Sequence, residues 1–522
     1  MMKHWQWIGV VVMSAVLIGS MTWRELYAEP HGTVVMALDA EIPTLDPWAH
    51  TTHAGLIATN WHIHDNLFIR DRETMKPQPG LAVSAIPINE LTWEIKLRQD
   101  VTFHNGEPFT AAVVKFNIDR VLAPENSLPR RSELTWLNDA RIDGDGEALI
   151  VVDDHTLHVR TKMPYPLMLE SLTTWPMISP THFEHVGANG YATHPVGTGP
   201  FRFVEWVQGQ DLVLEANPDY WMGPAAIATI VFRPLPDVAS QITELMGGQV
   251  QIMRPVPPSQ IDYLIHSGAA YVTSVPSLGV VYLHLDSSGR TTPPNPLLHP
   301  QVRRAIAHAI DVSALMQHIL LDKAILIPTG VNPRHFGYAP DVEGLPYDPA
   351  LARQLLADAG YPEGFMITLQ TYSGNIAALQ PVTEALVGFL EAVGLQVDIH
   401  HFDDTSRFTQ AMRHGELNGL SLMAWDSGAI FDADALLWPL IKSGEALSYT
   451  RDAAIDAWLY EARTTLDVVK RLDLYRNVQQ RLVEQVYWVP LYGQYEILGV
   501  SNTLDLRASS DAIVRLYYAR WR

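Results

Sequence analysis

The stretch from residue 91 to 122 has the clearest pattern of apolar and polar positions in the chain. Apolar and charged residues alternate from Trp93 to Arg98, which is the period of a half-buried strand. Asn105 and Gly106 then predict a turn, because both residue types tolerate a positive φ. Thr110 occupies the position of a helix N-cap, and apolar residues follow it at helical spacing. The pattern predicts a strand, a turn and a helix in this order.

Similar patterns predict elements further along the chain. A β-hairpin is expected at 201–214, where alternating apolar residues flank a Gln-Gly pair. The segment 348–360 predicts a helix, because it opens with Asp-Pro, which suits an N-cap and a first turn, and closes with glycine. From 366 to 424, predicted strands alternate with predicted helices. This alternation indicates an α/β unit with mainly parallel strands.

Length and composition narrow the function classes. A chain of 522 residues is too long for one hydrophobic core, so two or three domains are expected. The net charge of −21 argues against nucleic acid and anionic membranes as partners, and it fits either a cationic ligand or a solvated acidic surface. The chain has no cysteine, which excludes disulfides, thiolate metal sites and thiol catalysis.

The N-terminus predicts a secretion signal. Lys3 precedes an apolar run from Ile8 to Gly19, which is too short to span a bilayer. We expect cleavage after Ala28, although Leu26 is larger than the cleavage pattern prefers, so an uncleaved anchor is the alternative. Without a cysteine after the signal no lipid anchor is expected, and we predict a free periplasmic protein.

Three blocks of the sequence resemble the signature of family 5 extracellular solute-binding proteins, the peptide- and nickel-binding receptors of ABC importers. They are WEIKLRQDVTFHNGEPFTAAVV within 91–122, PVGTGPF with NPDYW within 195–221, and YDPALARQLLADAGYP at 347–362. Weaker matches extend the resemblance from about residue 34 to 504. The resemblance implies a type II periplasmic binding protein fold, an α/β architecture of two lobes with an extra subdomain.

The resemblance also implies that two β-strand hinge crossings join the lobes. We expect a signal peptide at 1–28, a first lobe at 29–274 with an inserted subdomain at about 60–190, a second α/β lobe at 275–487, and a return to the first lobe at 488–522. The lobes of such a protein close around a ligand, and the closed form docks on ABC transporter permease subunits. We expect a monomer that needs no cofactor and binds no nucleic acid.

The main site candidates follow the last strand of the predicted α/β lobe, where such sheets bind ligands. In peptide-binding relatives a W-x-x-D-x-x-D/E-P segment lies there, and an aspartate holds the α-ammonium of the peptide. This chain departs from that pattern, because Asp426 follows Trp425 directly and no proline follows Asp432-Ala433-Asp434. We predict ligand contacts from Trp425, Asp426 and Asp432.

Two further groups complete the predicted site. Thr44, Leu45 and Asp46 resemble a family loop that faces the cleft, and the alternative is a proline-framed turn capped by Asp46. Tyr372 and Ser373 follow the strand predicted at 366–371, at the same end of the sheet as Trp425. These five residues are predicted ligand-binding residues as well.

The most favoured ligand is a di- or oligopeptide, while nickel or another metal chelate, an opine or a sugar remain alternatives. A secreted hydrolase is the rival class, although the chain has no HExxH, G-x-S-x-G or P-loop motif. Presentation of a ligand to a chemoreceptor is compatible with transport. We predict no metal site: His62 and His64 point to different faces of a helix predicted at 55–66, and the acidic segment around Asp143 and Asp145 predicts a hairpin turn.

Overall fold

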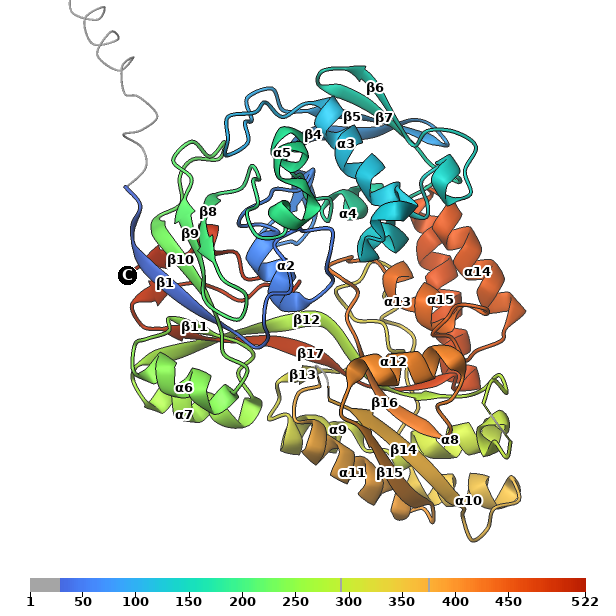
Figure 1. The fold of residues 1–522 in the computed structure, drawn as a ribbon. Coiled ribbons are helices and arrows are strands. Elements are labelled where there is room, and N and C mark those ends of the chain that lie inside the picture. The colour runs from blue at the N-terminus through green and yellow to red at the C-terminus, as the bar shows by residue number, and fades with distance from the viewer. Residues whose placement is uncertain (1–28, 292, 374–375) are drawn as a thin grey trace, which may run out of the picture.

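The computed structural model describes residues 29–522 except 292 and 374–375. It is a mixed α/β protein of two lobes joined by two long strands, β12 (Ala270–Leu285) and β17 (Trp488–Ser501). These two strands pair antiparallel over most of their length and run side by side through the middle of the molecule (Figure 1). The predicted fold class, with two strand crossings between the lobes, is confirmed.

Both crossing strands belong to one eleven-stranded sheet that extends through the two lobes. Its other strands are β1 (His31–Leu38), β8 (Phe201–Trp206), β9 (Leu212–Ala216), β10 (Ile227–Pro234), β11 (Ile252–Met253), β13 (Ala324–Ile325), β14 (Met366–Tyr372), β15 (Gln396–Phe402) and β16 (Leu420–Trp425). The order is β15-β14-β16-β12-β17-β11-β1-β10-β9-β8, and β13 pairs with β17 outside this path. Because β14 is parallel to both β15 and β16, the predicted parallel strands are confirmed.

The second lobe is built on the β14–β15–β16 side of the sheet. Its helices are α8 (Pro300–Ala309), α9 (Val312–Ala314), α10 (Pro349–Asp358), α11 (Leu379–Glu391), α12 (Thr405–His414), α13 (Asp434–Ile441), α14 (Ala453–Thr464) and α15 (Val468–Gln485). One hydrophobic cluster, drawn from residues 280–492, forms its core. Helix α10 begins as predicted, because Asp348 accepts a hydrogen bond of 2.9 Å from the Leu351 backbone N–H.

The first lobe contains the other side of the long sheet and a subdomain. Its helices are α2 (His53–Thr59), α3 (Ala111–Leu122), α4 (Met168–Leu172), α5 (Pro180–Tyr191), α6 (Val238–Met246) and α7 (Ile261–His266). The smaller strands are β2 (Phe68–Arg70) with β3 (Pro77–Pro79), β18 (Leu504–Asp505) with β19 (Arg520–Trp521), and a sheet ordered β4-β5-β7-β6 from β4 (Ala82–Asn89), β5 (Thr92–Leu97), β6 (Leu149–Asp153) and β7 (Thr156–Arg160).

The subdomain has a hydrophobic cluster of its own, drawn from residues 48–177. A second cluster packs around β1 and β10, and a third lies under α6 and α7. The residue limits of the lobes and of the insertion given from the sequence stay a prediction. Among the described residues, no helix is both long enough and apolar enough to cross a membrane.

The strand, turn and helix predicted for 91–122 are present. β5 buries Trp93 and the two apolar residues that alternate after it, and Gly106 has a φ of +86° in the turn. Helix α3 begins directly after Thr110, but the Thr110 side chain makes no capping hydrogen bond. The local pattern therefore predicts the elements correctly and only the cap differs.

The PVGTGPF and NPDYW blocks meet around one buried carboxylate, that of Asp65. It accepts hydrogen bonds from the Thr198 hydroxyl (3.1 Å), the Tyr220 hydroxyl (2.9 Å) and Trp221 Nε1 (2.9 Å). Burial raises the pKa of Asp65 to about 6 in spite of these donors. A Cβ at Gly197 would lie 1.9 Å from a backbone carbonyl oxygen, so only glycine fits there. Glycine is therefore required here for close backbone packing and not for binding a phosphate.

The helix predicted at 55–66 is too long. Helix α2 ends at Thr59, and Trp61 has a φ of +71°, which a helix does not tolerate. The apolar residues beyond it pack into the core from an irregular turn. His62 lies in this turn, where Nδ1 donates to the Ile57 carbonyl (2.7 Å) and Nε2 accepts from the Leu516 N–H (3.1 Å). Both ring nitrogens are therefore engaged in the core.

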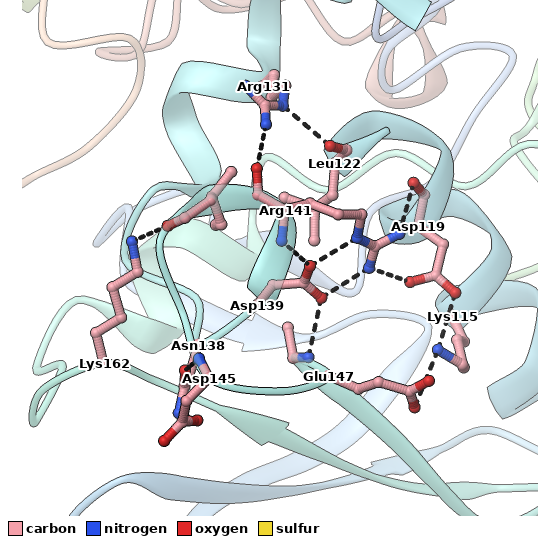
Figure 2. A network of polar contacts seen from close by, with 12 residues as sticks. Lys115, Asp119, Leu122, Arg131, Asn138, Asp139, Arg141, Asp145, Glu147 and Lys162 are labelled. Atoms are coloured by element: carbon pink, nitrogen blue, oxygen red, sulfur yellow. Dashed lines mark hydrogen bonds and ion pairs between the residues drawn. The ribbon is translucent and has the colours of Figure 1, made fainter. Parts of the chain in front are cut away.

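The hairpin turn predicted around Asp143 and Asp145 is also wrong, since the β6–β7 hairpin turns ten residues later. Arg141, just before this segment, bonds to Asp139 (2.6 and 2.7 Å) and to Asp119 (2.7 Å), as Figure 2 shows. Asp145 accepts a hydrogen bond from Asn138 (2.8 Å). Although burial opposes the shift, the hydrogen bonds from Arg141 lower the pKa of Asp139 to about 2. The charges in this segment form a structural network within the subdomain.

Candidate ligand-binding site

A cavity of about 1180 Å³ lies between the lobes. Both lobes, both crossing strands and the segment 511–513 near the C-terminus contribute to its wall. Seven aromatic residues line it: Trp61, Tyr165, Trp175, Trp425, Trp438, Tyr492 and Tyr495. A mostly apolar wall with a few fixed polar groups is typical of a small-molecule site, and the volume is sufficient for a ligand of several hundred daltons.

Asp426 contributes a carboxylate to this cavity from the loop that follows β16. One carboxylate oxygen accepts a hydrogen bond of 2.9 Å from the Gly428 N–H. The other oxygen has no hydrogen-bond donor among the described residues. The side chain is open to the cavity but enclosed by protein, and this burial, together with the nearby Asp511 and Glu496, raises its pKa. A cationic group of a ligand would relieve both effects.

The two acidic neighbours of Asp426 already have cationic partners. Glu496 on β17 pairs with Arg254 through two hydrogen bonds of 2.7 and 3.0 Å. Asp511 pairs with Arg515, with Nη1 at 3.0 Å and Nη2 at 2.5 Å. These paired charges hold each other in place. Asp426 therefore differs from them in having an ionised oxygen available to a ligand.

The subdomain supplies an aromatic stack to the opposite wall. The Tyr165 ring stacks on Trp136 with ring centroids 4.1 Å apart, and Trp136 stacks on Trp175 at 5.9 Å. Tyr165 and Trp175 both line the cavity. Such rigid flat surfaces bury the apolar parts of a ligand at low entropic cost.

The lobes touch each other beside the cavity. Arg70 on β2 donates a 2.5 Å hydrogen bond to the Ala429 carbonyl, and the Phe431 N–H donates to Glu170 at 3.1 Å. Arg70 also pairs with Glu170 at 2.7 Å, and Ile430 packs on the core of the subdomain. The loop that carries Asp426 is thus clamped against the first lobe, in a closed arrangement.

Of the residues predicted from the loop after β16, Trp425 and Asp426 line the cavity and Asp432 does not. Asp432 is buried, and it accepts hydrogen bonds from Arg471 (2.8 Å) and from the Tyr475 hydroxyl (3.0 Å). Its carboxylate therefore holds α15 against the loop. The role of Asp432 as a ligand contact stays a prediction, and the observed contacts of Asp432 do not support it.

The other predicted residues lie outside the cavity wall. Asp46 is buried, forms an ion pair with Arg120 and caps the turn through the Trp48 N–H (3.1 Å), while Thr44 and Leu45 precede it in the same turn. This matches the turn alternative stated above. At the other lobe, the Tyr372 ring stacks on Phe408 at 4.5 Å, and the Ser373 hydroxyl faces His401 Nε2 at 3.1 Å.

Sequence reasoning missed several polar residues of the wall, namely Asp39, His53, Arg254, Glu496 and Asp511. Two of them could have been predicted from their positions after strands. Asp39 directly follows β1 and Arg254 directly follows β11, and these two strands are parallel neighbours. The carboxyl ends of parallel strands meet at one edge of a sheet, which is where α/β proteins bind ligands. The other three residues come from a helix, a crossing strand and a loop with no such signal.

Comparison with known proteins identifies the family. The pattern of the bacterial extracellular solute-binding proteins, family 5 (middle region), matches residues 76–448. The chain belongs to this family. The glutathione-binding protein GsiB of Salmonella typhi is 30% identical over 485 residues, which cover 90% of this chain and 91% of that protein. The predicted resemblance is confirmed.

Solved structures have the same fold. The periplasmic binding protein DppA from Helicobacter pylori, in complex with the peptide STSA, gives a TM-score of 0.79 at 23% identity and covers 94% of this chain and 98% of that one. NikZ from Campylobacter jejuni, in complex with Ni(L-His), gives 0.78 at 20% identity, covering 93% and 98%. The solute-binding protein described here is thus a component of an ABC transporter and not an enzyme.

Proposed function

We propose that this solute-binding protein captures a short peptide with a free amino terminus in the cavity between its lobes. The glutathione-binding and peptide-bound relatives support a peptide-like ligand. Asp426 then accepts the ammonium group, Trp425 and the aromatic stack of the subdomain cover the apolar parts, and closure removes both from water. A buried ammonium requires a charged acceptor, and Asp426 presents one.

The observation that carries this proposal is the unshared oxygen of Asp426. The neighbouring acids Glu496 and Asp511 are neutralised by Arg254 and Arg515, so that among these three carboxylates only Asp426 has an oxygen without a cationic partner. A ligand with one positive group fits this arrangement better than a neutral sugar does. A bare metal ion has less support, because no group of three or more His, Asp or Glu side chains among the described residues is placed to hold one.

The export of the protein and its cellular location are part of the proposal. Residues 1–28 lie outside the described part of the chain, and we propose that they form a signal peptide removed after Ala28, which leaves a monomer in the periplasm. The closed form then delivers its ligand to the permease subunits of the transporter. The intact mass of the protein purified from its own periplasm tests the cleavage site directly.

Native mass spectrometry of that same material, without refolding, identifies what the protein carries. We expect adducts of a few hundred daltons that fragment as short peptides. A single adduct with a metal isotope pattern, or an adduct that is a sugar, would contradict the peptide proposal.

Calorimetry then tests the anchor with a peptide found in this way. Asp426→Asn should lower its affinity at least about tenfold, because a charged hydrogen bond contributes about 1.5–3 kcal/mol. The matched control is Asp403→Asn, which removes one charge from an exposed side chain of the second lobe. N-acetylation of the peptide should cause a similar loss in the parent protein and little further loss in Asp426→Asn. Equal affinity of the two aspartate variants would contradict the anchor.

A further inference from the structure

The protonation of His53 is fixed by the residue beside it. Arg254 Nη1 lies 3.0 Å from His53 Nδ1. A guanidinium group can only donate hydrogen bonds, so Nδ1 must be the acceptor and carries no proton. The proton of the neutral ring is therefore on Nε2. Arg254 is itself held by Glu496, so this arrangement does not depend on the ligand.

His53 stays neutral at physiological pH. Burial lowers its pKa to about 3; Arg254 shifts the pKa in the same direction, and Asp511 opposes the shift. The ring lines the cavity, and Nε2 has no hydrogen-bond partner among the described residues. His53 thus presents an N–H donor without an acceptor, and it has no free lone pair with which to bind a metal ion. A donor without an acceptor is unfavourable in an enclosed cavity, so an acceptor oxygen of a ligand would stabilise the neutral His53 ring.

We propose that His53 on α2 binds an acceptor oxygen of the ligand, with Nε2–H as the donor. This inference rests on the proposed function and makes it more specific. Asp426 and His53 both lie close to Arg254 and Asp511, so the ammonium and the acceptor oxygen belong to the same end of the ligand. A short peptide has this order at its amino end, where a carbonyl oxygen follows the amino group directly. The same geometry disfavours coordination of a metal by His53.

The tautomer is measurable without any ligand. In protein labelled with ¹⁵N-histidine, a long-range ¹H–¹⁵N correlation spectrum separates Nε2–H, Nδ1–H and imidazolium forms, and the signal lost in His53→Gln identifies the ring. We expect the Nε2–H form at pH 7, with a shift when trialanine is added and no shift when nickel chloride is added. An Nδ1–H or imidazolium form, or a nickel-induced shift, would overturn the inference.

Affinities for trialanine test the donor itself. His53→Phe keeps a ring but removes the donor, and it should weaken binding about tenfold, whereas His53→Gln keeps an N–H near the same place and should stay within about threefold. The control is His266→Phe, on the exposed end of α7.

The outcomes separate this inference from the proposed function. If Asp426→Asn weakens trialanine binding while His53→Phe does not, His53 is no donor to the ligand and the peptide function stands. If the parent protein binds no peptide, both the proposed function and the assignment of a peptide oxygen to His53 are overturned, whatever tautomer the spectrum shows.

Discussion

The guanidinium of Arg70 donates a 2.5 Å hydrogen bond to the carbonyl of Ala429 across the boundary between the lobes. The same guanidinium stacks over the Phe431 ring at 4.7 Å and pairs with Glu170, which in turn accepts the Phe431 N–H. These contacts hold the loop of Asp426 in the position that faces the cavity. Closure of the lobes and placement of the Asp426 carboxylate are therefore one structural event.

Arg70→Ala should favour the open form. The substitution removes a charged hydrogen bond between the lobes and leaves Glu170 without its cation, so we expect ligand affinity to fall about tenfold. Small-angle scattering of the ligand-free variant should show a larger radius of gyration than the parent protein. Lys76→Ala, on the exposed side of the same β2–β3 pair, removes equal charge and should change neither quantity. An unchanged radius with unchanged affinity would show that the contact does not govern closure.

Ligand affinity should depend on the ionisation of Asp426. Its pKa is raised, so the carboxylate takes up a proton at a higher pH than an ordinary aspartate does. The ionised form binds an ammonium, and affinity should therefore fall as the pH is lowered through this raised pKa. Calorimetry from pH 7.5 to 4.5 measures the decrease, and binding should release protons near the pKa, which is seen as an enthalpy that depends on the buffer. In Asp426→Asn the affinity should vary much less over this range.

Asp432→Asn should affect stability more than binding. Asp432 faces Arg471 and the Tyr475 hydroxyl in the core, and its loss leaves a buried guanidinium without its charge partner. Breaking a buried ion pair typically costs about 3–5 kcal/mol. Urea unfolding should show a reduction of this order, while the affinity of the folded variant stays within about threefold. A tenfold loss of affinity at unchanged stability would return Asp432 to the ligand site.

Asp65→Ala should strongly destabilise the first lobe. It leaves three buried donors, on Thr198, Tyr220 and Trp221, without their acceptor, and an unsatisfied buried donor costs about 1–3 kcal/mol. We expect a loss of about 3 kcal/mol or more in the free energy of unfolding by urea. The exposed Asp100→Ala serves as the control and should change it by less than about 1 kcal/mol.

The pH dependence of Asp65 gives a second check. The folded pKa of about 6 lies above the ordinary value of 3.8, so the folded state holds the proton more tightly than the unfolded state does. The stability that this residue contributes is therefore fully present below about pH 4 and is lost as the pH rises through about 6. Asp65→Asn cannot titrate, and the difference in melting temperature between it and the parent should change across this window.

The sequence predicted what depends on neighbours along the chain. The strand and helix of 91–122 and the start of α10 at Asp348 follow from local spacing and capping. Trp425 and Asp426 were found because they follow a buried strand, which is a rule about sheet edges. The charges that neutralise the neighbours of Asp426 come from distant segments: Arg254 meets Glu496 only because β11 pairs with β17. No local pattern contains that pairing.

The same limit explains the two wrong elements. Beyond Thr59 the apolar residues keep helical spacing, yet tertiary contacts such as the one between His62 and Leu516 hold an irregular turn. Around Asp143 the local pattern did not show that Arg141 pairs with Asp119, which lies 22 residues away in the sequence. In both places partners far away in the sequence, or at the other end of a network, decide the backbone.

The place of β17 in the long sheet also determines when the protein can fold. This strand contributes side chains to the core of the second lobe, to the cluster around β1 and to the cluster under α6 and α7, and it pairs with β11, β12 and β13. It begins only at Trp488, so a chain still being synthesised lacks a strand that three hydrophobic clusters require. Neither lobe can complete its core until synthesis is nearly finished. The subdomain cluster, drawn from residues 48–177, contains no residue of β17, so the subdomain can form before either lobe completes its core.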